Sequence, residues 1–253
     1  MAPAPFPGPM SGFDRLARPY RWLEYLSFGR ALERCRLHFL PQLADTRRAL
    51  LLGDGDGRFA ERLLRTMVKA GAPQPALRLP DGSVTETAAS EDMQVVAIDG
   101  SAGMLAILQS RCAFARNLLV TYLTDLTQGL PAMLQYDRFD LVTTHFFLDC
   151  LSTAQVDRLV GDVKPRMTAN ARWVVSEFSV PPRGAMRLPA WTIVRGLYLG
   201  FRLLTGLRTQ RLPDYRSVLQ AHGFVLDQQT CMLAGLLTSE LWRLDKSPEP
   251  LES

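Results

Sequence analysis

Three glycines and two aspartates alternate in the stretch from Gly53 to Gly57. An apolar run over 49–52 precedes them, and Phe59, Leu63 and Leu64 recur at helical spacing after them. Glycine tolerates positive φ and lets a ligand approach the bare backbone. The N–H groups at the start of the following helix point toward whatever lies in the turn. This order of strand, glycine turn and helix predicts the beginning of an α/β nucleotide-binding fold.

The spacing of the glycines argues against two common nucleotide motifs. A dinucleotide fingerprint, G-x-G-x-x-G, would need its third glycine at Arg58, and a P-loop would need a Lys-Ser or Lys-Thr pair after the glycines. Asp54 and Asp56 would repel a pyrophosphate but tolerate a cationic or zwitterionic ligand. The competing interpretation is a glycine-rich surface turn that binds nothing.

Asp99 is a second candidate ligand residue. It ends the apolar run 95–98, which predicts a buried strand, and Ser101 is expected to cap a helix from Ala102 onward. A carboxylate at the end of the second strand can accept both hydroxyls of a ribose. The alternative is an acid near a helix N-terminus with no ligand.

These two stretches together resemble a known family. LLLGDGDGRF resembles motif I of the class I S-adenosylmethionine-dependent methyltransferases, and D-x-S-x-x-M-L, from Asp99 to Leu105, resembles their second motif. The resemblance implies a glycine turn under the methionine end of the cofactor and a methionine beside the adenine. One position departs from the family's motif I, because Leu51 stands where the family usually carries an acidic residue. Asp54 or Asp56 is the expected substitute that faces the methionine ammonium.

The resemblance extends to the later strands. It implies that Asp125 accepts from the adenine amino group while the backbone of Leu126 reaches the ring, although an aspartate in a loop turn explains Asp125 equally simply. The cofactor-binding residues implied in this way are Gly53, Asp54, Gly55, Gly57, Asp99, Gly100, Ser101, Met104, Asp125, Leu126 and His145.

His145 is the candidate general base, because an imidazole titrates near neutral pH and this one lies near the end of the fourth predicted strand, at the expected edge of the crevice. A structural or cofactor-flanking histidine is the competing interpretation. Asp149 is expected either to orient His145 or to cap the following helix. The aromatic residues expected to line the acceptor chamber are Tyr20, Tyr25 and Phe146.

The fold class predicted is α/β, a Rossmann-like, mostly parallel sheet of seven strands with an antiparallel last strand and helices on both faces. The strands are expected at 49–52, 95–98, 118–123, 139–147, 171–180, 224–226 and 236–244. One methyltransferase domain over 13–246 is expected, with N-terminal lid helices at 13–45 and a helical cap insert at 181–212. A disordered leader (1–12) and a frayed tail (247–253) would flank it. The C-terminal half resembles the ubiquinone/menaquinone-type enzymes.

The composition of the chain limits the kinds of binding partner that we expect. The net charge of +4 in 253 residues comes without a long Lys/Arg run, so no nucleic-acid binding is expected. The four cysteines lie far apart without a C-x-x-C pair, which predicts no metal site, no disulfide framework and a cytoplasmic location. The apolar, arginine-bearing insert 181–212 suits a lipophilic or aromatic acceptor, an interfacial membrane contact, a homodimer contact or a plain helical cap.

The function predicted is methyl transfer from S-adenosyl-L-methionine to a small lipophilic or aromatic acceptor, with S-adenosyl-L-homocysteine as product. Positioning would supply most of the rate. Leu51 keeps open a non-catalytic cofactor-binding regulatory or assembly module. An NAD(P)-dependent oxidoreductase is a weaker alternative because its third glycine is missing. THFFLD follows the fourth strand in place of an N/D-P-P-Y/F tetrad, which argues against a nucleic-acid methyltransferase.

Overall fold

A seven-stranded sheet in the order β3-β2-β1-β4-β5-β7-β6 forms the centre of the molecule. The computed structural model describes residues 30–71, 93–179 and 213–245. Only β7 runs antiparallel to the other strands of this sheet. The strands are β1 (Arg48–Leu52), β2 (Gln94–Asp99), β3 (Leu119–Leu123), β4 (Phe139–His145), β5 (Met167–Phe178), β6 (Phe224–Met232) and β7 (Leu237–Leu244).

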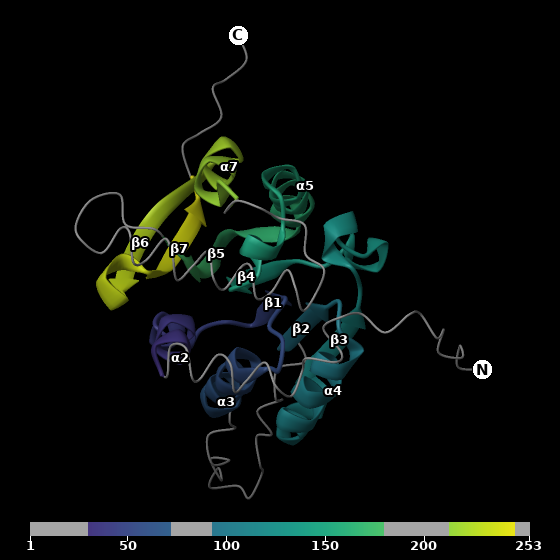
Figure 1. Ribbon diagram of the computed structural model, residues 1–253. Coiled ribbons are helices and arrows are strands. Elements are labelled where there is room, and N and C mark those ends of the chain that lie inside the picture. Colours follow the sequence, from purple (N-terminus) through teal and green to yellow (C-terminus); the bar gives the residue numbers. More distant parts are fainter. Residues whose placement is uncertain (1–29, 72–92, 180–212, 246–253) are drawn as a thin grey trace, which may run out of the picture.

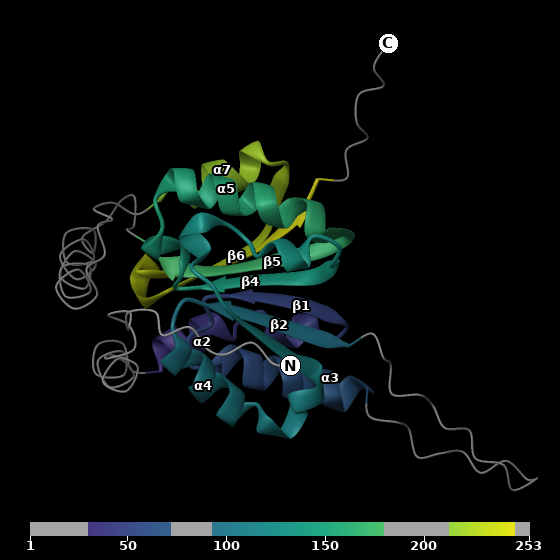
Figure 2. The ribbon, with the colours of Figure 1, turned by 90° about the vertical axis from the view of Figure 1, so that its right-hand side faces the viewer.

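Helices cover both faces of the sheet and make a three-layered molecule (Figures 1 and 2). On one face lie α2 (Ala31–Arg36), α3 (Arg58–Gly71) and α4 (Ala102–Arg111). On the other lie α5 (Thr153–Val163) and α7 (Tyr215–Ala221). Short 3-10 turns connect these elements: η1 (Leu40–Leu43), η2 (Ala113–Leu118), η3 (Leu126–Gln128), η4 (Ala132–Leu134), η5 (Leu148–Cys150), η6 (Lys164–Arg166) and η7 (Leu233–Gly235). The predicted fold class is confirmed.

The central strands are apolar on both sides because alternate side chains enter different cores. Leu50 packs in the cluster that lies under α5 and α7, together with Trp173. Leu51 packs in the opposite cluster with Phe59 and Leu63 of α3. All of these side chains are fully buried, and burial of each stabilises the fold by about 1.5–3 kcal/mol.

Side-chain caps fix where several helices begin. Ser152 accepts from the Gln155 amide while the Gln155 side chain accepts from the Ser152 amide, a reciprocal capping box at the start of α5. Ser101 accepts from the amide of Met104 at the start of α4, and Asp214 caps α7. The capping role predicted for Ser101 is confirmed, whereas Ser152 rather than Asp149 caps α5.

The predicted bounds of three strands were wrong. β4 ends at His145 rather than 147, because Phe146 has a φ of 55° and turns the chain out of the sheet. β5 begins at Met167, ahead of the predicted 171, and ends at Phe178 rather than 180. β6 continues to Met232, well past 226. The polar sequence of β6 gave no indication of this length, because an edge strand pairs on one side only and leaves its side chains exposed.

Several predictions lie wholly or partly outside the described residues. They are the leader 1–12, the lid residues up to 29 with Tyr20 and Tyr25, the insert 181–212 and the tail 247–253. Of the lid region 13–45, the structure describes α2 and η1, and α2 packs against β7 through Leu32 and Cys35. In the described part of the chain, no helix is both long and apolar enough to cross a membrane.

The environment of Leu51 generates a prediction about the missing motif acid. Leu51→Asp should lower the free energy of unfolding by roughly 3–5 kcal/mol, because it places an uncompensated charge in an apolar cluster. Leu51→Met, a volume-conserving control, should cost less than about 1.5 kcal/mol. Urea unfolding measures both. Equal stability of the two variants would show that a carboxylate is accommodated at this position.

Candidate functional site

The glycine turn joins β1 to α3 with left-handed backbone at all three glycines. Their φ values are 67° at Gly53, 61° at Gly55 and 79° at Gly57. A Cβ atom on Gly53 would lie 2.3 Å from the Phe147 ring, and one on Gly57 would lie 2.9 Å from Cα of Leu108. Among the described residues, no atom lies within 4 Å of a Cβ placed on Gly55. The outer glycines are therefore required by packing within the protein, whereas the described residues leave space over Gly55 that a ligand can occupy.

Asp99 connects the end of β2 to this turn. One carboxylate oxygen accepts from the Gly55 amide at 3.1 Å, and the other accepts from the Ser101 amide at 2.9 Å. Each carboxylate oxygen offers more than one lone pair, so a carboxylate that binds backbone amides can also accept from the hydroxyl groups of a ligand. The structure thus brings together the two strongest motifs of the sequence, at the carboxyl edge of the parallel strands where α/β proteins bind ligands.

The two aspartates of the turn have different environments. Asp56 is held by two arginines: Arg58 Nε lies 2.9 Å from Oδ1, and Arg111 Nη2 lies 3.0 Å from Oδ2. Asp54 is buried and accepts from the Ala60 amide at the N-terminus of α3, at 3.0 Å. Its other oxygen, Oδ1, is buried and has no hydrogen-bond partner among the described residues.

Burial raises the pKa of Asp54 from 3.8 to about 7, against the opposing effects of the Arg36 charge and the Ala60 amide. A positively charged group beside Oδ1 would favour the ionised form. Of the two candidate substitutes for the missing motif acid, Asp54 is therefore the one suited to a cationic ligand. Asp56 already has its charge balanced within the protein.

Arg36 is a site residue that the sequence reasoning missed. It comes from α2, is 6% exposed, and holds its guanidinium 5.5 Å from the centre of the Phe146 ring. Its charge lowers the pKa of both Asp54 and His145. The sequence feature that could have revealed Arg36 is its spacing from Leu32 and Cys35, which places the arginine on the buried side of the short helix.

His145 is enclosed on the α3 side of the sheet. Its ring centre lies 4.4 Å from that of Phe59, and its Nδ1 lies 2.9 Å from Ser176 Oγ. Burial, reinforced by the charge of Arg36, holds the pKa of His145 well below its ordinary value, so the ring is neutral at pH 7. Nε2 has no hydrogen-bond partner among the described residues. A base role stays a prediction that requires the acceptor to reach Nε2.

The segment that follows β4, residues 146–148, packs against the end of β5. Phe146 packs on Phe178 with ring centres 5.2 Å apart, and its positive φ is uncommon for a bulky residue. The amides of Phe147 and Leu148 both donate to Glu177 Oε1, at 3.1 and 2.8 Å. Glu177 is a second residue that the sequence reasoning missed. Phe146 as an acceptor contact stays a prediction.

The residues predicted near an adenine gather at the ends of β2 and β3. The amide of Thr124 donates to the Asp99 carbonyl at 3.0 Å, which places 124–126 beside the Asp99 segment. Asp125 caps η3 by accepting from the Thr127 amide, and Leu126 is buried. Met104 is 7% exposed, and among the described residues a Cβ on Gly100 would meet only the Thr124 carbonyl, at 3.8 Å. The capping bond explains an aspartate at position 125 without any ligand, so the contact of Asp125 with an adenine stays a prediction.

Among residues 30–71, 93–179 and 213–245, no group of three or more His, Cys, Asp or Glu side chains could hold a metal ion.

The glycine geometry generates a stability prediction. Gly57→Ala should cost roughly 2–5 kcal/mol, because the left-handed backbone penalty adds to a clash with the Leu108 backbone. Gly55→Ala should cost only about 1–2 kcal/mol, since it carries the backbone penalty without a clash. Urea unfolding compares the two. A larger loss for Gly55→Ala would mean that the space above Gly55 is closed by protein.

Comparisons with known proteins bear on the fold. No protein-family model matches the chain, and no curated protein matches it. Solved structures do match: mitomycin 7-O-methyltransferase MmcR has a TM-score of 0.60 at 11% identity, covering 93% of this chain and 61% of that one. The pyocyanin biosynthetic protein PhzM has a TM-score of 0.57 at 16% identity, covering 92% and 62%.

A third match is CalO1, a methyltransferase in calicheamicin biosynthesis solved with S-adenosylhomocysteine bound. Its TM-score is 0.55 at 17% identity, covering 90% of this chain and 57% of that one. The chain spans about three fifths of the length of these structures. At such low identity the likeness establishes the architecture. The chain therefore has the Rossmann-like α/β fold of the class I methyltransferases.

Proposed function

We propose that this protein is an S-adenosylmethionine-dependent methyltransferase that acts on a small molecule. The observation that carries the proposal is the bond between the Asp99 carboxylate and the Gly55 amide, beside the open space over Gly55. In this arrangement the ribose hydroxyls bind Asp99 and the methionine end lies over the glycine turn. The predicted adenine contacts, Met104, Asp125 and Leu126, lie on the β2 and β3 side of the same edge.

The residues present fit the charge of this cofactor better than that of a dinucleotide. Asp54 offers a buried carboxylate oxygen to the ammonium group, and it does so from the turn itself. A pyrophosphate in the same place would meet two aspartates, one of them buried. Leu51 no longer favours a non-catalytic module, because Asp54 supplies the acid that motif I lacks.

The bound cofactor would supply an activated methyl group. The protein then has to hold the acceptor in line with that group and exclude water, and such positioning can supply most of the rate. Aromatic side chains at the ends of β4 and β5, Phe146, Phe147 and Phe178, suit a flat or lipophilic acceptor.

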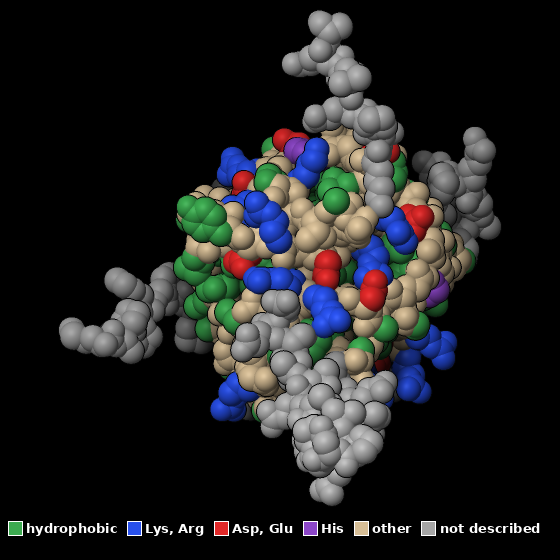
Figure 3. Space-filling model, turned by 180° about the vertical axis from the view of Figure 1, so that it is seen from behind, with side chains coloured by type: hydrophobic (Ala, Val, Ile, Leu, Met, Phe, Trp, Pro, Cys, Tyr) green, Lys and Arg blue, Asp and Glu red, His purple; other side chains and the backbone are tan. Residues whose placement is uncertain are grey.

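The nature of the acceptor is supported by two further observations. MmcR is named a 7-O-methyltransferase of mitomycin, and CalO1 acts in calicheamicin biosynthesis, so proteins with this fold act on small natural products. Figure 3 shows Lys and Arg side chains interspersed with Asp and Glu over one face, with no continuous basic patch on its described part. Small-molecule O-methylation is the reaction we favour. A cytoplasmic location, a homodimer and membrane contact through 181–212 stay predictions.

Calorimetric titration with S-adenosylmethionine and S-adenosylhomocysteine tests the cofactor. Asp99→Asn should weaken binding by about 2–3 kcal/mol, because it removes charge-assisted acceptance of two hydroxyls. Gly55→Ala should weaken binding strongly while remaining folded. Asp227→Asn, which removes only a surface ion pair with Arg243, is the matched control.

NADH and NADPH serve as negative controls in the same titrations, because we expect neither of them to bind. Saturable binding of the nicotinamides alone would overturn the proposal in favour of an oxidoreductase. Unchanged affinity in folded Asp99→Asn would remove the ribose assignment.

The environment of Asp54 predicts a pH dependence of cofactor binding. Because the free protein holds this carboxyl at a pKa of about 7, binding of an ammonium beside it must release a proton at lower pH. Affinity should therefore rise roughly tenfold between about pH 5.5 and pH 7. Asp54→Asn should bind more weakly at pH 7 and lose this slope. A slope that survives in Asp54→Asn would assign the proton to another group.

A further inference from the structure

Arg111 is the last residue of α4, and its guanidinium lies against the glycine turn. Nε donates to the main-chain carbonyl of Asp56 at 2.8 Å, and Nη2 donates to Asp56 Oδ2 at 3.0 Å. Nη1 lies 3.5 Å from Oε2 of Glu61, in the first turn of α3. A planar guanidinium holds its donors in fixed directions and can bind several acceptors at once. One side chain thus joins the end of α4 to the turn and to the helix that follows it.

The carbonyl that Arg111 binds belongs to the peptide unit between Asp56 and Gly57. Glycines stand on both sides of Asp56, and both Gly55 and Gly57 have positive φ. Glycine places little steric restriction on its backbone angles and loses much conformational entropy when it is ordered. The neighbouring residues therefore do little to hold this peptide unit in one orientation. The hydrogen bond from Arg111 Nε supplies a constraint that the glycines do not.

Helix α4 and the residues just before it contact the turn at two places. Ahead of the helix, the Asp99 carboxylate accepts from the amide of Gly55. Near its end, Leu108 lies three residues before Arg111 and therefore on the same face of the helix. A Cβ atom on Gly57 would come within 2.6 Å of Leu108 Cγ, so this face packs closely on the turn. The turn is therefore held at Gly55 and again at 56–57.

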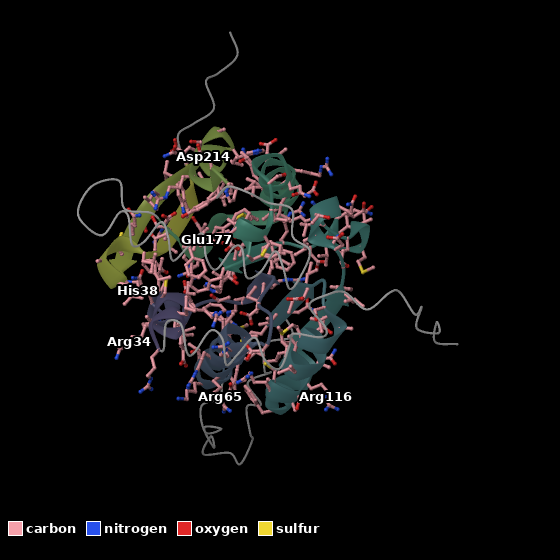
Figure 4. The ribbon with its side chains drawn as sticks, viewed as in Figure 1. Arg34, His38, Arg65, Arg116, Glu177 and Asp214 are labelled. Carbon is pink, nitrogen blue, oxygen red and sulfur yellow. The ribbon has the colours of Figure 1, made fainter. Side chains whose placement is uncertain are left out.

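The contact between Arg111 and Asp56 is partly shielded from water. The Arg111 side chain is 24% exposed and the Asp56 side chain is 12% exposed. Charge-assisted hydrogen bonds of this kind are stronger than those between neutral groups. Figure 4 shows two other arginines of the α3 and α4 layer, Arg65 and Arg116, and both lie toward the edge of the molecule. Arg116 is exposed and provides a matched control for Arg111.

We propose that Arg111 is a positioning residue that sets the affinity of the glycine turn for the amino-acid end of the cofactor. The inference rests on the proposed function, in which that end lies over Gly55 and the ribose binds Asp99. Arg111 acts through the turn, because its contacts are with Asp56 and Glu61. When these contacts are lost, the peptide unit between Asp56 and Gly57 must be ordered as the ligand binds. That ordering lowers the affinity.

The test compares two ligands that differ at this end. S-Adenosylhomocysteine carries the amino-acid group, whereas methylthioadenosine keeps the adenine, the ribose and the sulfur but ends in a methyl group. In calorimetric titrations, Arg111→Met should lower the affinity for S-adenosylhomocysteine on the order of tenfold and change that for methylthioadenosine less than about threefold. Arg116→Met, which removes an exposed arginine of the same layer, should match the wild type with both ligands.

Equal losses for the two ligands in Arg111→Met would indicate a general structural role and overturn the inference. So would unchanged affinity for both ligands, or the same selective loss in Arg116→Met, which would assign the effect to long-range charge. A wild type that binds neither ligand contradicts the proposed function instead. Should Arg111→Met fail to fold, Arg111→Lys takes its place, because it retains the charge without the planar guanidinium. It should show the same selective loss, on the order of threefold or more.

Hydrogen exchange of the unliganded proteins decides the case in which the wild type binds S-adenosylhomocysteine but binds methylthioadenosine too weakly to measure. The backbone amides of 53–60 should exchange faster in Arg111→Met than in Arg116→Met, because the turn has lost its constraint. The amides of β2 should exchange equally in the two variants. Equal exchange over 53–60, or faster exchange in β2 as well, would contradict the positioning role.

Discussion

The site depends on one hydrogen bond, from the Gly55 amide to the Asp99 carboxylate. It joins the end of β1 to the end of β2 and fixes the left-handed turn between the sheet and α3. Glycine is required there because the backbone has positive φ and because a side chain would occupy the space over Gly55. This contact holds Asp99 beside the glycine turn that precedes α3.

Charged side chains surround this hydrogen bond, and they place the two aspartates of the turn in different electrostatic environments. Asp56 is balanced by Arg58 and Arg111 on the outside of the turn. Asp54 lies inside, where burial works against ionisation and the Arg36 charge favours it. Under the proposed function, an ammonium group beside Asp54 would favour its ionised form, so cofactor binding would be coupled to the loss of a proton.

Local patterns in the sequence were sufficient to predict the sheet, the glycine turn, the position of Asp99 at the end of β2 and the cap at Ser101. These features depend on residues adjacent in the chain, where periodicity and capping chemistry are decisive. Arg36 and Glu177 were missed, and the enclosure of His145 was not foreseen. Each depends on packing between segments distant in sequence, such as α2 against β7. Edge strand β6 was underestimated because one-sided pairing leaves no apolar alternation to detect.

The most direct measurement is a crystal structure of the protein with S-adenosylhomocysteine bound. We expect the ribose hydroxyls at the Asp99 carboxylate, the methionine end over Gly55 and the ammonium within hydrogen-bond distance of Asp54 Oδ1. We also expect the sulfur on the side of the turn that faces Phe147. A ligand bound away from the glycine turn, or a ribose that leaves Asp99 untouched, would contradict it.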